Sequence, residues 1–478
     1  MEWEIVMGLE VHTELATKTK IFCGCSTEFG AGPNEHVCEI CSGMPGTLPV
    51  LNQNVLEYAI RTGLATNCEI TRKNKFDRKN YFYPDLPKAY QISQLYFPIC
   101  RNGHLTVEDK DGNTKEIGIH EIHMEEDAGK LIHDDFEECT MVDYNRCGVP
   151  LLEIVSEPDF RSAEEVIAYL EQLRGILQFT GVSDCKMQEG SLRADVNLSV
   201  RPKGQTEFGT RTEMKNLNSF HAIERAIAYE AERQIELLED GETVTQETRR
   251  WDDNKGISYA MRSKEDAQDY KYFPEPDLPP LEISEETIER IRKEMPELPA
   301  QKKARYVETL GLPAYDAGVL LSDRSYVKLF EDTIALGADA KTASNWIMGE
   351  VMKLLKDTAT LPEDMTLRAE DFAKILELVS KNTINRGTGK TVLEKVFKEG
   401  VNPEAYVKEN NLAQITDLSA LRPILEDVIA NNEKSVTEYR GGKTQAMGYI
   451  MGQAMRALKG KAPAQEVQKL LKEMLDNN

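Results

Sequence analysis

The chain has no long apolar run and no excess of basic residues. No hydrophobic stretch approaches the ~18 residues that a membrane-spanning helix needs, and the first residues, Met-Glu-Trp-Glu-Ile, lack the basic region of a signal peptide. We therefore expect a cytoplasmic protein that makes no membrane contact. The net charge of −23 also disfavours attraction to nucleic acid by bulk charge. Any RNA contact must come from a local basic patch.

A phosphate-binding loop of the ATPase type is also missing. Gly441-Gly-Lys-Thr444 ends like one, but position 437, where its first glycine should stand, is Thr437, and no apolar strand precedes it. A glycine turn that enters an RNA-facing helix is the better interpretation. From residue 440 to residue 478, seven Lys or Arg residues outnumber three acidic ones. This tail is the predicted RNA-binding patch, with contacts expected from Arg440, Lys443, Arg456 and Lys459.

The nine cysteines are unevenly spaced, and four of them fall in one short segment. Cys23-Gly-Cys25 and Cys38-Glu-Ile-Cys41 are separated by twelve residues. In a reducing compartment this spacing predicts a closed, structural zinc site with four thiolate ligands. The alternative is four unrelated buried thiols.

Residues 76–91 combine five aromatic residues with charged residues of both signs. Pro84 and Pro87 each remove a backbone donor and fix φ, so we expect neither a helix nor a central strand through this stretch. The mixture is typical of a rigid loop that stacks against and hydrogen-bonds a polar, partly planar ligand. A surface loop held in place by its aromatic residues would show the same composition.

Carboxylates and histidines recur in patterns that favour a metal or phosphate site. The alternation from Trp3 to Val11 predicts a half-buried strand with Glu10, His12 and Glu14 on its polar face. His123-Met-Glu125-Glu126-Asp127 supplies the hard ligands that magnesium prefers, although a solvated acidic loop would look similar. Glu153 lies within an apolar run, where a carboxylate needs a partner, a metal or a shifted pKa.

The remaining pattern predicts an α+β chain. A strand over 192–200 and a return strand through Glu213 place Arg193, Asp195 and Glu213 on one polar face, which suits either a substrate cavity or plain solvation. Helices are expected near 51–66, from Ser162, from Asn218 or Ser219, and from Ser284. We predict a cradle with an antiparallel sheet over 1–290, an all-α domain over 291–402 and an all-α tail over 403–478.

Several long motifs resemble those of the B subunits of aspartyl/glutamyl-tRNA amidotransferases, and the likeness covers nearly the whole chain. They include Gly8-Leu-Glu-Val-His12, Phe76-Asp-Arg-Lys-Asn-Tyr-Phe-Tyr-Pro-Asp85, His123-Met-Glu-Glu-Asp-Ala-Gly-Lys130, Glu153-Ile-Val-Ser-Glu-Pro-Asp159, Glu189-Gly-Ser-Leu-Arg193, Tyr272-Phe-Pro-Glu-Pro-Asp277 and Gly448-Tyr-Ile-Met-Gly-Gln453. The resemblance implies a ligase whose cradle is related to the glutamine synthetase fold. ATP would phosphorylate the side-chain carboxyl of Glu-tRNA(Gln) or Asp-tRNA(Asn), and ammonia from a partner amidase subunit would displace the phosphate. A small third subunit would hold the two larger ones together.

The resemblance also implies roles for individual residues. The magnesium ligands would be Glu10, His12, Glu153 and either Glu125 or Glu126, which one sequence does not separate. Lys79 and Lys88 match positions at the ammonia channel and the reaction site. Weaker matches for nucleotide or substrate contacts are Tyr81, Asp85, Arg193, Asp195 and Glu213. The four cysteines match a zinc knob present in some members. The alternatives are a non-catalytic tRNA-binding scaffold and a free-standing ligase for a small carboxylic acid.

Overall fold

The computed structural model describes residues 2–108, 112–134, 139–263, 270–414, 418–458 and 462–476. The chain forms two compact units, Met1–Pro299 and Ala300–Asn478. No helix in the described ranges is long and apolar enough to cross a membrane. Helix α4, Glu285–Glu294, belongs to the first unit, because Ile288 and Ile291 are part of its hydrophobic core.

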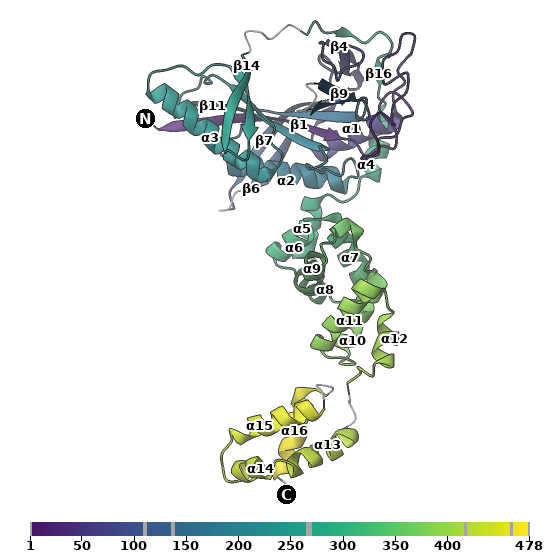
Figure 1. Cartoon of the computed structure of the whole chain (residues 1–478), viewed down its shortest axis with the longest axis vertical. Helices are drawn as coiled ribbons and strands as arrows, with labels where there is room; N and C mark the ends of the chain where they lie inside the picture. Colours follow the sequence, from purple (N-terminus) through teal and green to yellow (C-terminus); the bar gives the residue numbers. More distant parts are fainter. Residues whose placement is uncertain are drawn as a thin grey trace. The chain divides into compact units, whose positions relative to one another are not determined.

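The first unit is organised around a nine-stranded sheet (Figure 1). The strand order is β14-β13-β12-β11-β1-β10-β7-β6-β2. Every pairing in this sheet is antiparallel except that of β12 with β13. In chain order the strands are β1 (Trp3–Glu14), β2 (Glu69–Ile70), β6 (Cys100–Glu108), β7 (Thr114–Glu126), β10 (Pro150–Ser156), β11 (Leu192–Pro202), β12 (Thr212–Lys215), β13 (Glu247–Asp252) and β14 (Ile257–Ser263).

Three helices cover one face of this sheet: α1 (Gln53–Ala65), α2 (Ala163–Phe179) and α3 (Phe220–Glu239) (Figure 1). The predicted N-cap at Ser162 is confirmed, and of the two predicted alternatives Asn218 and Ser219 the cap of α3 is Ser219. Both serine hydroxyls accept hydrogen bonds from the backbone N–H groups three residues on. Apolar side chains of the helices and of alternate strand positions form one continuous core.

The alternation predicted for β1 is confirmed. Met7, Leu9 and Val11 are buried in the core under the helices. Because successive side chains of a strand point to opposite faces, Glu10 and His12 lie on the face that the three helices leave uncovered. The long central strands therefore build a rigid platform whose uncovered face carries Glu10 and His12.

The structure corrects the prediction for residues 76–91. Strands β4 (Asp77–Asn80) and β5 (Tyr90–Ser93) flank a loop, and β4 is the central strand of a small sheet ordered β15-β4-β5, with β15 at Phe273–Pro274. The prolines remove donors only within the loop, so pairing on either side of it remains free. Two further ribbons pair β16 (Leu281–Glu282) with β3 (Lys73–Asn74) and β8 (Lys130–Asp134) with β9 (Cys139–Asp143).

The second unit is helical within its described residues, and it has two separate cores. One core joins helices from Tyr306 to Val407, and the other joins helices from Leu421 to Leu475. Glu331 ties two helices of the first core together, because Lys302, Arg305 and Tyr306 all donate to it. The elements are α5 (Pro299–Glu308), α6 (Ala314–Leu320), α7 (Arg324–Ala335), α8 (Ala340–Trp346), a π-helical turn (Ile347–Val351), α9 (Met352–Asp357), a 3₁₀ turn (Pro362–Asp364), α10 (Ala369–Ser380), α11 (Arg386–Glu399), α12 (Pro403–Glu409), α13 (Leu418–Ala430), α14 (Glu433–Arg440), α15 (Ala446–Ala457) and α16 (Ala464–Asp476).

Candidate functional site

A first cluster of ligand-type side chains lies across three adjacent strands. His12 on β1, Glu153 on β10 and Glu125 on β7 present one ligand atom each, all within 4.8 Å of one another. His12 Nε2 is 3.8 Å from the nearest oxygen of each carboxylate. The antiparallel register places His12 opposite Glu153, and Leu151 opposite Glu125, so the geometry follows from strand pairing. An imidazole and two carboxylates form a donor set that suits a divalent cation.

Burial and charge crowding shape the titration of this first cluster. Burial and the neighbouring Glu153 carboxylate raise the pKa of Glu125 to about 8. Burial, assisted by Arg193 and Lys215, lowers the pKa of His12 to about 3, which leaves its imidazole neutral. Neutral imidazole is the form that binds a metal. Ser93 Oγ donates to Glu125 Oε2 over 3.1 Å and so fixes the orientation of the carboxylate.

A second cluster lies beside the first on the same face. Glu10 on β1, Asp195 on β11 and Glu213 on β12 place one oxygen each within 4.8 Å of one another. Lys215 Nζ lies 2.8 Å from Asp195 and 3.0 Å from Glu213. Asn197 Nδ2 donates to Glu10 over 2.9 Å. Three oxygens with a lysine beside them suit a cation that carries a phosphate.

The residues predicted to form one metal centre are therefore divided. Glu10 joins the second cluster, whereas His12, Glu125 and Glu153 form the first. Glu126 belongs to neither, because its two oxygens contact Lys88 Nζ at 2.5 and 2.7 Å, and one of them also accepts from the Ile92 N–H. Adjacent residues of a strand point to opposite faces of the sheet, so Glu125 and Glu126 of β7 lie on different faces.

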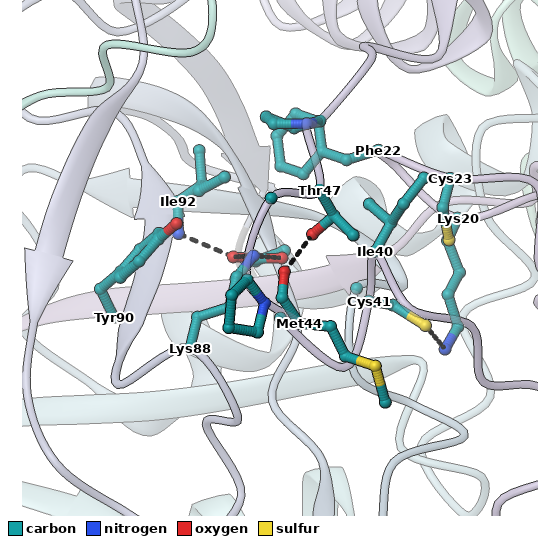
Figure 2. A pocket seen from close by; sticks show the side chains of 16 residues that line it. Lys20, Phe22, Cys23, Ile40, Cys41, Met44, Thr47, Lys88, Tyr90 and Ile92 are labelled. Atoms are coloured by element: carbon teal, nitrogen blue, oxygen red, sulfur yellow. Dashed lines mark hydrogen bonds and ion pairs between the residues drawn. The ribbon is translucent and has the colours of Figure 1, made fainter.

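The Lys88–Glu126 pair lines a cavity of about 210 Å³ (Figure 2). Tyr90 and Ile92 form one wall, and the cysteine-bearing segment forms another. Gly43 in that segment approaches Lys88 so closely that a Cβ there would lie 2.4 Å from Lys88 Cγ, and its φ of +68° also favours glycine. The cysteine segment and Lys88 therefore hold each other in place.

The four predicted cysteines come together. Cys23, Cys25, Cys38 and Cys41 present their sulfurs within 4.8 Å of one another, and Cys41 Sγ lies 4.0 Å from Cys25 Sγ and 3.9 Å from Cys38 Sγ. Tetrahedral zinc–thiolate geometry requires sulfur atoms about 3.8 Å apart. The fully buried Lys20 also points its Nζ at Cys41 Sγ from 3.5 Å (Figure 2). A structural zinc site fits this arrangement.

Three tyrosines and a lysine lie close to the first cluster. Lys79 Nζ lies 5.9 Å from the ring centre of Tyr81 and 5.0 Å from that of Tyr270. The rings of Tyr270 and Tyr272 meet edge to face, as do those of Tyr81 and Tyr270. Burial raises the pKa of Tyr81 and of Tyr272, with Glu125 and Glu153 adding to the effect at Tyr272. These contacts bring Lys79 and Tyr81 beside the first cluster, together with Tyr270 and with Tyr272, which begins one of the quoted motifs but had no predicted role.

Two residues with predicted roles, and Asn197 of β11, each carry a buried polar atom that has no hydrogen-bond partner within the protein. Within the described ranges, Asp85 Oδ1, Arg193 Nε and Asn197 Oδ1 are buried and form no hydrogen bond. Arg193 does place Nη2 2.5 Å from Asp127 Oδ2. Burial alone would raise the pKa of Asp127, but Arg193 and Arg146 hold it below its usual value. Buried polar atoms are normally paired with protein or water, so these atoms are available to hydrogen-bond water or a bound molecule.

A clamp behind the tyrosines was also missed by the sequence analysis. Arg78 Nε and Nη2 donate hydrogen bonds of 2.6 and 2.9 Å to the carboxylate of the fully buried Glu275, and Asp277 accepts from Nη2 at 3.0 Å. The guanidinium stacks on Tyr90 at 4.2 Å. This clamp holds β15 against β4 and so keeps Tyr272 near the first cluster. Both partners lie in quoted motifs, Phe76–Asp85 and Tyr272–Asp277, but nothing in either motif states that they pair.

Removing the clamp is expected to release the segment that follows residue 270. Arg78→Met leaves the Glu275 carboxylate buried without its cation, which costs about 3 kcal/mol or more. Hydrogen exchange should show lost protection at the Glu275 N–H, which now donates to the Phe76 carbonyl. Arg72→Met is the matched control, because its pair with Glu285 is exposed and is worth at most about 1 kcal/mol. Equal loss of protection in both variants would contradict a specific role for the clamp.

Of the predicted tail contacts, Arg440 ends α14, Lys443 lies between α14 and α15, and Arg456 lies in α15. Arg440, Lys443 and Arg456 are exposed. Arg440 Nε donates to the Leu475 carbonyl at 3.3 Å, and Lys443 is 4.0 Å from Glu438. Lys459 lies outside the described residues. Because Arg440, Lys443 and Arg456 are exposed, they are accessible to an anionic partner, but no geometry in the described helices singles out a binding groove.

Comparison with known proteins assigns the class of this fold and site. A family model described as the GatB/GatE catalytic domain matches residues 5–289, and a model described as the GatB domain matches residues 328–475. Proteins named as the B subunit of aspartyl/glutamyl-tRNA(Asn/Gln) amidotransferase are similar over essentially their whole length. The chain is 60% identical to those of Lachnoclostridium phytofermentans and Lachnospira eligens, with 99% of each chain covered, and 58% identical to that of Caldicellulosiruptor saccharolyticus, with 100% covered.

The chain belongs to the family of aspartyl/glutamyl-tRNA(Asn/Gln) amidotransferase B subunits. The resemblance inferred from the sequence motifs is thereby confirmed. Both clusters, Lys79, Lys88 and the four cysteines fall within the stretch matched by the catalytic-domain model.

Proposed function

We propose that this chain is the subunit that activates and amidates the amino acid carried by a misacylated tRNA. The side-chain carboxyl of Glu-tRNA(Gln) or Asp-tRNA(Asn) attacks the γ-phosphorus of ATP, and ADP leaves. Ammonia then attacks the resulting acyl phosphate, inorganic phosphate departs, and the nitrogen loses a proton to give the amide. Glutamine supplies the ammonia through a partner amidase subunit, and a small third subunit joins the two.

The observation that carries this proposal is the pair of clusters on one face of the sheet. Glu10 and His12 are two residues apart on β1, so their side chains lie about 7 Å apart and face the same way. Phosphoryl transfer between two anions requires neutralisation of charge on both. When bound, magnesium would supply that neutralisation, held by His12, Glu125 and Glu153 on one side and by Glu10, Asp195 and Glu213 on the other.

Residues around the clusters would position the substrates. A cavity of about 260 Å³ beside Glu10 is lined by Asn197, Phe208 and Arg211, and we place the nucleotide there. Lys79 with the three tyrosines would receive the aminoacyl end of the tRNA, and Arg193 and Asp85 offer it their unpaired polar atoms. Lys88 and Glu126 would line the path of ammonia into the site from the adjoining cavity.

Other parts of the proposal rest on the sequence and the family. The four cysteines would hold structural zinc, and Arg440, Lys443, Arg456 and Lys459 would contact tRNA. The relation of the cradle to the glutamine synthetase fold, and the three-domain division at residues 290 and 402, remain predictions. A non-catalytic scaffold is the second candidate function, but it leaves both clusters without a purpose.

Phosphate release from ATP tests the proposal directly. The full chain, with its amidase and bridging partners and magnesium but no glutamine, should release phosphate with Glu-tRNA(Gln) and not with uncharged tRNA(Gln) or free glutamate. Release with free glutamate would favour a small-molecule ligase. Glutamine-dependent amide formation that persists after Glu10 and His12 are both replaced by Ala would establish the scaffold instead.

A further inference from the structure

A buried ionic cluster lies on the helix-covered face of the sheet, behind the second metal-type cluster. Its centre is Glu230 on α3, which is fully buried. Arg233 donates to it at 2.6 and 2.9 Å, and Arg249 Nε lies 3.3 Å away. Thr212, Gln234 and Ser258 add hydrogen bonds of 2.9 to 3.3 Å. One carboxylate thus connects α3 with strands β12, β13 and β14.

Of the three strands that Glu230 contacts, β12 and β13 form the one parallel pairing of the described nine-stranded sheet. Glu213 stands opposite Thr248, and Met214 stands opposite Arg249. The register of β13 against β14 shifts between Thr248 and Arg249, which marks a bulge at this point. Bulges bend a strand and redirect its side chains. Arg249 is held through Glu230 and through Ser258, to whose carbonyl it donates at 2.9 Å.

The opposite face of the same two strands carries the site. Thr248 Oγ1 donates to Glu213 Oε2 over 2.7 Å. Glu213 in turn belongs to the cluster with Glu10 and Asp195. Because adjacent residues of a strand point to opposite faces, fixing Thr212 and Arg249 from behind fixes Glu213 and Thr248 in front.

We propose that Glu230 is a positioning residue for the Glu10–Asp195–Glu213 cluster. By holding Thr212 and Arg249 it sets the alignment of β12 against β13, and thus the direction in which Glu213 presents its carboxylate. The inference rests on the proposed function, since it assumes that this cluster binds a divalent cation. Glu230 stays ionised: burial would raise its pKa, but hydrogen bonds and charge from Arg233 hold it below its usual value.

Manganese binding to the full-length chain tests this role without relying on activity. Free Mn²⁺ can be followed by electron paramagnetic resonance during titration of the chain with Mn²⁺ alone. Glu213→Gln identifies the sites that depend on this cluster. Thr212→Val is a milder change than Glu230→Gln, because it removes one hydrogen bond to Glu230. Both variants should lower the Mn²⁺ affinity of the same sites by about 10-fold or more, the effect commonly seen when a residue that positions a metal ligand is replaced. The double variant Thr212→Val/Thr248→Val should lose less Mn²⁺ binding free energy than the sum of the losses in the two single variants, because both substitutions act through Glu213.

Glu331→Gln is the control, because it removes a half-buried carboxylate with several cationic partners in the second unit. It should leave manganese affinity unchanged. If Glu230→Gln and Thr212→Val lower the melting temperature but bind Mn²⁺ as the wild type does, Glu230 is only structural and the inference is wrong. If Glu213→Gln itself binds Mn²⁺ as the wild type does, the cation site of the proposed function is wrong as well.

Discussion

Replacing Glu125 by Gln is expected to abolish phosphate release that depends on charged tRNA, whereas replacing Glu126 by Gln is not. Glu125 is buried in the cluster with His12 and Glu153. Glu126 is directed away from that cluster and pairs with Lys88. Replacing a residue that only hydrogen-bonds to a metal ligand typically lowers metal affinity or activity roughly 10- to 100-fold. Loss of a ligand itself should therefore lower the rate of phosphate release by at least about 100-fold.

The measurement is the rate of phosphate release as a function of magnesium concentration, with tRNA affinity measured on the same samples. Glu125→Gln should lose the magnesium response and keep tRNA affinity. Glu126→Gln should keep the magnesium response and lose glutamine-dependent amide formation, because the Lys88 cavity is disturbed. The reverse pattern would show that the cation site uses the other glutamate. Normal amide formation in the Glu125 variant would support the scaffold alternative.

Replacing Cys41 by Ser is expected to remove bound zinc and unfold the segment around it. Cys41 is the most buried of the four sulfur donors, and the loops between them contribute little apolar burial; Phe29, for example, is 70% exposed. The binding energy of a structural zinc is folding energy. Without it, residues 23–42 rely on polar contacts such as those of Asn34 with Asp143 and of His36 with Lys20 and Asn145. Gly43 would then lose its close contact with Lys88, and amide formation should fall as well.

Zinc content and hydrogen exchange over residues 20–50 report the outcome. Wild type should hold a single equivalent of zinc and protect this segment, whereas the Cys41 variant should do neither. Cys139→Ser is the matched control, since Cys139 is exposed and lies outside the cluster. Retention of zinc and of protection in the Cys41 variant would show that the four thiols are packed without a metal.

Local periodicity and spacing were enough to predict several features of this protein. The alternation of β1 placed Glu10 and His12 on one face, and the serine caps set the starts of α2, α3 and α4. The spacing of the four cysteines predicted that they lie close together, because only a short loop separates the two cysteine pairs. Long motifs identified the family, and this conclusion needed no coordinates.

The combination of these side chains across distant strands depended on the folded chain. The pairing of β1 with β10 on one side and β11 on the other gave His12 and Glu10 different partners, so one expected centre became two clusters. Which glutamate joins His12 depends on the register of β7, which no local pattern states. The Arg78–Glu275 clamp and the Glu230 cluster connect residues far apart in the chain. Such contacts arise from strand order and burial, and a charged residue in a sequence does not reveal which distant partner neutralises it.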